Sequence, residues 1–387
     1  MAEYKRSKKV VKKKIPLLHK KVTKRTPSKS SKDIHKKLVL PKKYQTKTHP
    51  TILKKFIENP IISPVPHKAW ESRATFNPTA LYADGKVHLI YRAIGDSDIS
   101  NFGYAASEDG LSINKRSHTP AYVQRMSLDR REIMYSTYSS GGGTQGGCED
   151  PRLTQIGDKV YMIYTSFNGW NSIRIALTSI SLEDFIVEHW KWKEPVFISS
   201  PGEIHKNWVI FPKKINGKYA ILSGISPKIM IEYVKDLDEF DGRTFIESSV
   251  PNGKGYDTKS WDNCLRGVGP APLYTKEGWL VFYHAMDTRD PNRYKLGAML
   301  LDHKDPTKII ARSKRSILEP DECYENEGHK RGVVYSCGAV IIKNWLYVYY
   351  GGADTVTCVA AAELKPFIKD LLSNKPAKLK KPRLKKK

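Results

Sequence analysis

The sequence predicts an all-β protein, a five-bladed β-propeller with disordered basic tails at both ends. Short aromatic-rich runs with strand character recur from Phe56 onward, and few segments show helical periodicity. A turn followed by a pair of strands can be found five times, with the turns near residues 85, 158, 217, 278 and 344. These turns are 73, 59, 61 and 66 residues apart, which is typical of propeller blades. A β-sandwich with coincidental spacing is the alternative.

Each copy of the repeat predicts two neighbouring strands joined by a loop. The first strand of each pair follows the turn directly and is rich in Val, Ile, Leu and Tyr. The predicted pairs are 85–92 with 102–107, 158–164 with 173–179, 217–222 with 228–233, 278–284 with 295–301, and 344–350 with 355–361.

The positive charge of the chain is concentrated at its two ends. The 387 residues include 66 Lys and Arg against 40 Asp and Glu, a net charge of +26. Residues 1–55 hold 20 basic and 2 acidic residues, residues 365–387 hold 10 and 1, and the stretch between them is nearly neutral. We therefore expect disordered Lys-rich tails at 1–55 and 365–387 and one folded domain at 56–364. The tails predict a loose affinity for polyanions or a localisation signal.

Composition also excludes several classes of protein. The sequence lacks the run of about 18 apolar residues that a membrane-spanning helix needs, and its basic N-terminus has no signal-peptide core. Its five cysteines are an odd number with no C-x-x-C pair, which argues against a disulfide framework and a zinc site. We expect a cytoplasmic protein with reduced thiols, no metal and no membrane partner.

Ionisable residues and one asparagine border the apolar strands of several repeats. The inner strands of a propeller converge on a central depression, so a site there would collect one or two side chains from each repeat. An unpaired charge beside an apolar strand is costly, so each of these residues has either a function or a structural ion-pair partner. The candidates are Asn77, Arg92, Glu149, Asp150, Arg152, Arg174, Lys206, Asp262, Arg266, His284, Asp287, Glu325 and Asp354.

At these residues the sequence resembles glycoside hydrolase family 130, whose members are five-bladed propellers that act on β-mannosides. The resemblance runs from about Pro60 to Leu364 and rests on eight motifs in the same order. They are Phe76-Asn77-Pro78-Thr79-Ala80, Leu89-Ile90-Tyr91-Arg92-Ala93, Ala105-Ala106-Ser107-Glu108-Asp109-Gly110, Glu149-Asp150-Pro151-Arg152, Lys206 to Pro212, Gly278 to His284, Leu300 to Pro306, and Tyr349-Tyr350-Gly351-Gly352-Ala353-Asp354.

The resemblance implies inverting phosphorolysis, in which inorganic phosphate attacks the anomeric carbon of a short β-1,4- or β-1,2-linked mannoside and mannose 1-phosphate forms. It implies that Asp150 is the proton donor, acting through the 3-hydroxyl of the mannosyl unit. Phosphate would be a co-substrate, with no cofactor. The expected phosphate ligands are Arg152, Arg174, Lys206 and His284, and the expected substrate contacts are Asn77, Arg92, Asp354, Asp287 and Trp208.

One position departs from the family pattern. Ser223-Gly224 stands where the family commonly has His-Arg, and that His belongs to the phosphate site. Loss of one charge-assisted hydrogen bond of about 1.5–3 kcal/mol weakens phosphate binding by roughly one to two decades. An inverting β-mannosidase is therefore an alternative, with Glu325, Asp262, Asp287 or Glu203 as the water-activating base. If His284 or Arg266 replaces the missing phosphate ligand, the protein would still be a phosphorylase.

A third hypothesis is a glycan-binding propeller without catalytic activity, tethered by its basic tails. The presence of Asp150 weighs against this hypothesis. The glycine-rich stretch 141–147 lacks the Lys and Ser/Thr of a P-loop, so no nucleotide site is expected. The expected partners are a β-mannoside and phosphate, and a homo-oligomer is left open.

Overall fold

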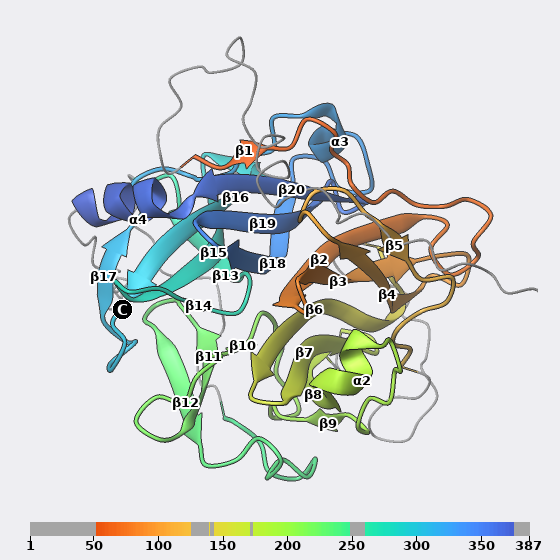
Figure 1. Ribbon diagram of the computed structural model, residues 1–387, viewed down its shortest axis with the longest axis horizontal. Coiled ribbons are helices and arrows are strands. Elements are labelled where there is room, and N and C mark those ends of the chain that lie inside the picture. The colour runs from red at the N-terminus through yellow and green to blue at the C-terminus, as the bar shows by residue number, and fades with distance from the viewer. Residues whose placement is uncertain (1–51, 125–138, 140–142, 171–172, 248–259, 375–387) are drawn as a thin grey trace, which may run out of the picture. The chain divides into compact units, whose positions relative to one another are not determined.

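The computed structural model describes residues 52–124, 139, 143–170, 173–247 and 260–374. Nearly all of the predicted N-terminal tail and residues 375–387 of the C-terminal tail lie outside these residues. The described chain is built mostly from strands, with three short helices, as an all-β protein requires (Figure 1). The helices are α2 (Leu182–Ile186), α3 (Cys323–Asn326) and α4 (Leu364–Ser373).

The first half of the body forms one eight-stranded sheet made of two antiparallel runs. A short parallel pairing between β4 and β6, with Ile99 opposite Gly146, joins the two runs. The strands of this sheet are β2 (Ala74–Ala83), β3 (Lys86–Ile94), β4 (Ile99–Ser107), β5 (Lys115–Arg116), β6 (Gly146–Ile156), β7 (Lys159–Phe167), β8 (Ile173–Ser181) and β9 (Val196–Phe197).

Three smaller antiparallel sheets follow along the chain. The first contains β10 (Val209–Ile210), β11 (Tyr219–Gly224) and β12 (Met230–Val234). The second contains β13 (Cys264–Val268), β14 (Leu273–Tyr274), β15 (Trp279–Asp287), β16 (Asp290–Leu301) and β17 (Ile309–Arg312). The third contains β1 (Lys54–Lys55), β18 (Val334–Ile342), β19 (Trp345–Gly352) and β20 (Val356–Glu363).

The turn that opens each predicted repeat lies in the structure between two strands or at the start of one. At two of these turns both central residues have positive φ: Asp84 (46°) with Gly85 (72°), and Asn216 (52°) with Gly217 (79°). This conformation matches the right-handed twist of the flanking strands and favours Asn, Asp and Gly. The five strand pairs that follow the turns are all present.

A buried polar triad lies inside the sheet of β15 and β16. The hydroxyl of Tyr283 donates a hydrogen bond of 2.7 Å to Asp262, and the guanidinium of Arg312 bonds to both Tyr283 and Asp262. A Cβ on Gly297, the residue opposite Tyr283, would lie 2.4 Å from the tyrosine ring, so glycine is required for the ring to pack there.

The sheet of β3 and β4 repeats this triad with different residues. Tyr91 donates to Glu71 at 2.7 Å, Arg116 bonds to both, and Gly103 lies opposite Tyr91. The recurrence supports the repeat inferred from the sequence, because two copies far apart in the chain contain the same hydrogen-bonded set of a tyrosine, an arginine and a carboxylate. It also assigns Asp262, one of the candidate bases, to a structural ion pair.

The third sheet joins the two ends of the folded body. Lys54 and Lys55 of β1 pair with β20, and the Lys55 ammonium forms an ion pair with buried Glu325, which also accepts a hydrogen bond from Tyr350. These residues extend the folded body past the predicted boundary at 56. Glu325, another candidate base, is therefore engaged in closing this sheet.

The predicted C-terminal boundary at 364 also differs from the structure. Helix α4 continues to Ser373 and buries Phe367, Ile368 and Leu371 in the core cluster that contains Leu280 and Leu346. Three apolar residues at helical spacing are sufficient to hold this short helix, although the stretch around it is rich in lysine. None of the described helices is long and apolar enough to cross a membrane.

We predict that Tyr283→Phe lowers the free energy of unfolding by about 1–3 kcal/mol, because it removes a hydroxyl that satisfies a buried carboxylate and guanidinium. Urea unfolding should show a lower midpoint with an unchanged slope. The matched control is Tyr274→Phe, whose ring is 48% exposed and which should change stability by less than about 0.5 kcal/mol. Equal midpoints for the two variants would contradict a stabilising role for the triad.

Candidate functional site

Two identical β-bulges direct polar side chains out of the strands that carry them. On β2, Asn77 and Pro78 lie opposite the single residue Tyr91, and on β6, Asp150 and Pro151 lie opposite the single residue Tyr164, so each bulge adds one residue to its strand. Asn77 (φ 48°) and Asp150 (φ 52°) both adopt the left-handed conformation, which residues other than glycine seldom occupy. Bulges and strained backbone of this kind concentrate at functional sites.

The bulges open onto a cavity of about 490 Å³. Most of its buried lining residues are polar, whereas other lining side chains are exposed and form the mouth of the cavity. The lining residues are Asn77, Arg92, Asp150, Trp170, Ile204, Lys206, Asn207, Arg266, Tyr294, Lys330, Val333, Tyr335 and Asp354.

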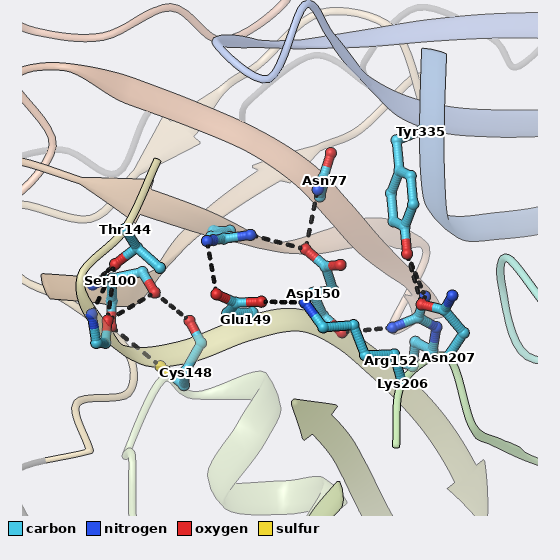
Figure 2. A network of polar contacts seen from close by, with 12 residues as sticks. Asn77, Ser100, Thr144, Cys148, Glu149, Asp150, Arg152, Lys206, Asn207 and Tyr335 are labelled. Carbon is cyan, nitrogen blue, oxygen red and sulfur yellow. Dashed lines mark hydrogen bonds and ion pairs between the residues drawn. The ribbon is translucent and has the colours of Figure 1, made fainter. Parts of the chain in front are cut away.

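A buried ion network holds the carboxylate of Asp150 in place (Figure 2). Arg92 Nη1 lies 3.3 Å from Asp150 Oδ1, and Arg92 Nη2 lies 3.1 Å from Glu149 Oε1. Asn77 donates to the same Asp150 oxygen at 2.9 Å, and the Lys206 ammonium lies 3.1 Å from Glu149 Oε2. The neighbouring Glu149 therefore balances much of the positive charge around Asp150.

The same network determines the protonation of Asp150. Burial by itself would raise the pKa of Asp150, but Arg92, Arg152, Lys206 and the hydrogen bond from Asn77 outweigh burial and lower the pKa below its usual value. Asp150 is therefore a carboxylate at neutral pH when no ligand is bound.

Asp354 is the second carboxylate that lines the cavity, and its environment has the opposite effect. Burial raises the pKa of Asp354 to about 6, and the attraction of Lys330 and Arg92 offsets burial only in part. Asp354 also has positive φ, at 51°. The cavity thus contains two carboxylates whose pKa values are shifted apart.

Arg152 was predicted to bind phosphate, but the structure uses it as a cross-link behind the cavity wall. Its buried guanidinium donates to Gly269 O at 2.9 Å, Asp150 O at 2.7 Å and Asn207 Oδ1 at 3.0 Å, and to Tyr335 Oη at 3.3 Å. Arg152 does not line the cavity. It positions Asn207 and Tyr335, and these two residues line the cavity.

His284 also lies behind the wall. Its ring stacks on Tyr335 with the centroids 4.0 Å apart, and its Nε2 accepts a hydrogen bond from the Ser336 amide. Burial, with the nearby Arg152 charge, lowers the pKa of His284 to about 3. His284 was predicted to be a cationic phosphate ligand. The structure instead has a neutral imidazole that does not line the cavity.

Two further predicted site residues, Arg174 and Asp287, do not line the cavity. Arg174 stacks over Phe197 at 3.9 Å and donates to Ser199 O. Asp287 accepts hydrogen bonds from Arg289 and Asn263 near the end of β15. Of the predicted phosphate ligands, only Lys206 lines the cavity.

Trp208 was predicted to contact the sugar but belongs to the core. Its side chain is buried in the cluster that contains Ile163 and Ile210. Asn207, with φ of 65°, turns the backbone just before it, so Lys206 and Asn207 line the cavity and Trp208 does not. No local pattern in the sequence indicates this break in strand alternation.

The structure adds cavity residues that the predicted site omitted. Arg266 was a candidate residue and a compensating cation in the sequence, although it was not among the expected phosphate ligands. It is the bulged residue of β13 and occupies the same kind of position as Asp150. Lys330 and Tyr335 come from regions without a local sequence signal. Ser223, at the departure from the family pattern, is buried in β11 and does not line the cavity.

No candidate water-activating base from the sequence lines the cavity. Glu203 faces His205 at 3.3 Å, and Asp262 and Glu325 are held in the ion pairs described above. Among the residues that the structure describes, no group of three His, Cys, Asp or Glu side chains could hold a metal ion.

We predict that Asp354→Asn raises the free energy of unfolding at pH 7.5 by about 1–3 kcal/mol, because it removes a buried charge. The folded-state pKa lies above the unfolded value, so the wild type gains relative stability as pH falls through about 6. The advantage of Asp354→Asn should therefore shrink at pH 5. Urea unfolding at both pH values measures this, with the exposed-site variant Asp158→Asn as control. A pH-independent difference would contradict the raised pKa.

Comparison with known proteins agrees with this architecture. A sequence model of a glycoside hydrolase 130 family, described as β-1,4-mannooligosaccharide phosphorylase, matches residues 52–372. A 1,2-β-oligomannan phosphorylase from Thermoanaerobacter sp. (strain X514) is 39% identical over 318 residues, which are 80% of this chain and 96% of that protein. A β-1,2-mannobiose phosphorylase from the same strain is 35% identical and covers 79% of this chain and 95% of its own.

A solved structure is similar as well. A glycosyl hydrolase from Bacteroides ovatus has a TM-score of 0.66 and 26% identity, and the match covers 81% of this chain and 94% of that one. Because the family model spans most of the sequence, the chain belongs to glycoside hydrolase family 130.

Proposed function

We propose that the protein is an inverting phosphorylase that cleaves short β-mannosides with inorganic phosphate and releases mannose 1-phosphate. The observation that carries the proposal is the cavity itself, where the buried carboxylate of Asp150 lies among Arg92, Lys206 and Arg152. Two relatives that match nearly the full folded body are phosphorylases of β-1,2-linked mannosides, which favours the β-1,2 linkage.

The cations for phosphate are proposed to be Lys206, Arg266 and Lys330. Within the described part of the chain, no carboxylate forms an ion pair with Arg266 or Lys330, whereas Lys206 is shared with Glu149. Arg266 and Lys330 lie at the ring of Tyr294, with the guanidinium carbon and the ammonium 5.6 and 4.9 Å from its centroid. Two exposed cations on one cavity are suited to a doubly charged oxyanion. They would compensate for the histidine that the sequence lacks.

Asp150 is proposed to donate the proton. A phosphate oxygen bonds to the anomeric carbon while the bond from that carbon to the leaving oxygen breaks, and the leaving oxygen takes a proton. Asp150 must be protonated first, and an anion beside Lys206 reduces the positive potential that keeps its pKa low. Monobasic phosphate passes a proton to Asp150 and attacks as the dianion. Asp150 passes that proton to the leaving oxygen, so the products are mannose 1-phosphate monoanion and a free sugar, and Asp150 is again a carboxylate.

The inverting β-mannosidase is kept as a second candidate because Asp354 shares the cavity with Asp150. A hydrolase needs a basic carboxylate to activate water in addition to the acid. Asp354, with its pKa of about 6, is the group that could take this role. We propose that Asn77 and Arg92 contact the mannosyl ring. In the phosphorylase, Asp354 would contact this ring as well.

We also infer a five-bladed propeller in which the eight-stranded sheet contains two blades and the three smaller sheets contain one each. The short parallel pairing of β4 with β6 would then be the contact between two neighbouring blades. The five cysteines are unpaired thiols, which fits the proposed cytoplasmic location.

We predict that the purified protein releases mannose 1-phosphate from β-1,2-mannobiose or longer β-1,2-mannosides only when phosphate is present. Anion chromatography of the products with and without phosphate measures this. Free mannose formed equally fast without phosphate would identify the hydrolase, and binding without either product would favour the non-catalytic alternative.

We predict that Asp150→Asn lowers kcat by roughly 10²–10⁴-fold, because an amide cannot donate the proton to the leaving oxygen. Asparagine tolerates the left-handed backbone at this position, so the fold should be kept, and circular dichroism checks this. The control Asp158→Asn changes an exposed carboxylate and should keep wild-type kcat. A normal rate in Asp150→Asn would remove Asp150 from the reaction.

A further inference from the structure

The mouth of the cavity has an apolar part that the chemistry at Asp150 does not use. Nine large hydrophobic side chains are exposed in the described chain, and two of them, Trp170 and Ile204, line the cavity. Trp170 is 46% exposed and Ile204 is 57% exposed, whereas the inner residues Asn77, Asp150 and Asp354 are buried. Exposed apolar groups at the mouth of a polar site mark a surface for a ligand.

The ring of Trp170 is held in place from one side. It follows β7 closely and packs edge to face on the buried ring of Phe167, with the centroids 6.1 Å apart at 81°. Because Phe167 is fully buried, this contact restrains the indole while nearly half of its surface stays open. A restrained aromatic ring loses little conformational entropy when a ligand stacks on it.

The cationic part of the mouth comes from other elements. Arg266 belongs to β13, and Lys330 lies between α3 and β18, whereas Trp170 and Ile204 come from the chain between β7 and β10. An inverting displacement brings the nucleophile and the leaving group to opposite faces of the anomeric carbon. Phosphate and the leaving sugar therefore need separate binding surfaces, and the charged part of the mouth is the one suited to phosphate.

We infer that Trp170 and Ile204 form the binding surface for the leaving-group sugars of a β-mannan oligosaccharide, and that they set the preference for chain length. This inference rests on the proposed function. The C–H face of a sugar ring stacks on the indole, and Ile204 contributes additional apolar contact. The buried polar residues hold the mannosyl unit that is transferred, so the apolar surface acts on the remainder of the chain.

The test compares Trp170→Ala and Trp170→Phe with the wild type on β-1,2-mannobiose and β-1,2-mannotetraose. Trp170→Ala should raise KM for mannotetraose about tenfold and Trp170→Phe less, while KM for phosphate stays unchanged. In the synthetic direction, KM for the acceptor sugar should rise and KM for mannose 1-phosphate should not. Tyr82→Ala removes another exposed ring, 42% exposed and outside the cavity lining, and should change none of these values.

A binding measurement separates this inference from the proposed function. Isothermal titration of mannotetraose without phosphate should show about tenfold weaker binding to Trp170→Ala, whether or not the wild type performs phosphorolysis. If the wild type shows no phosphorolysis but Trp170→Ala still binds mannotetraose more weakly, only the proposed function is overturned. Unchanged binding and KM in Trp170→Ala, or a matching rise in KM for phosphate, would overturn the inference.

Discussion

The candidate site depends on one buried guanidinium. Arg92 lies between Glu149 and Asp150, at 3.1 and 3.3 Å, and all three side chains are buried. Removal of a buried cation from two carboxylates would leave uncompensated negative charge, which is strongly destabilising. The ion pairs therefore fix both the position of Asp150 and its charge, and the other cavity residues are arranged around them.

The backbone contributes a second constraint, because the key side chains emerge where strand geometry is interrupted. Asn77, Asp150, Asn207 and Asp354 all have positive φ. The proline that follows Asn77 or Asp150 has no backbone N–H, and it stands at a bulge where the ladder requires none. The surrounding contacts hold these conformations, as at Gly351, where a Cβ would lie 2.3 Å from Asn77 Oδ1. Strain in the backbone is thus compensated by close packing from a neighbouring sheet.

The distribution of charge around the cavity favours phosphate over activated water. The cations Arg92 and Lys206 are balanced by Glu149, while Arg266 and Lys330 are exposed at the mouth beside Tyr294. Arg152, which looks like a phosphate ligand in the sequence, instead donates its hydrogen bonds to carbonyl oxygens and to Asn207 and Tyr335. A cation contributes to anion binding only where its donors are not already satisfied by the protein.

Local patterns in the sequence were sufficient to identify the strand pairs and their turns, the family, and the inner residues Asn77, Arg92, Asp150 and Asp354, because alternation, turn chemistry and short motifs are local. Which other side chains reach the cavity depends on the fold. Arg174, His284 and Trp208 resemble site residues in sequence but are held by Ser199, Tyr335 and the core, whereas Arg266 and Lys330 reach the mouth. The physical reason is that the direction of a side chain at a bulge or loop depends on partners from distant strands. A linear pattern does not specify those partners.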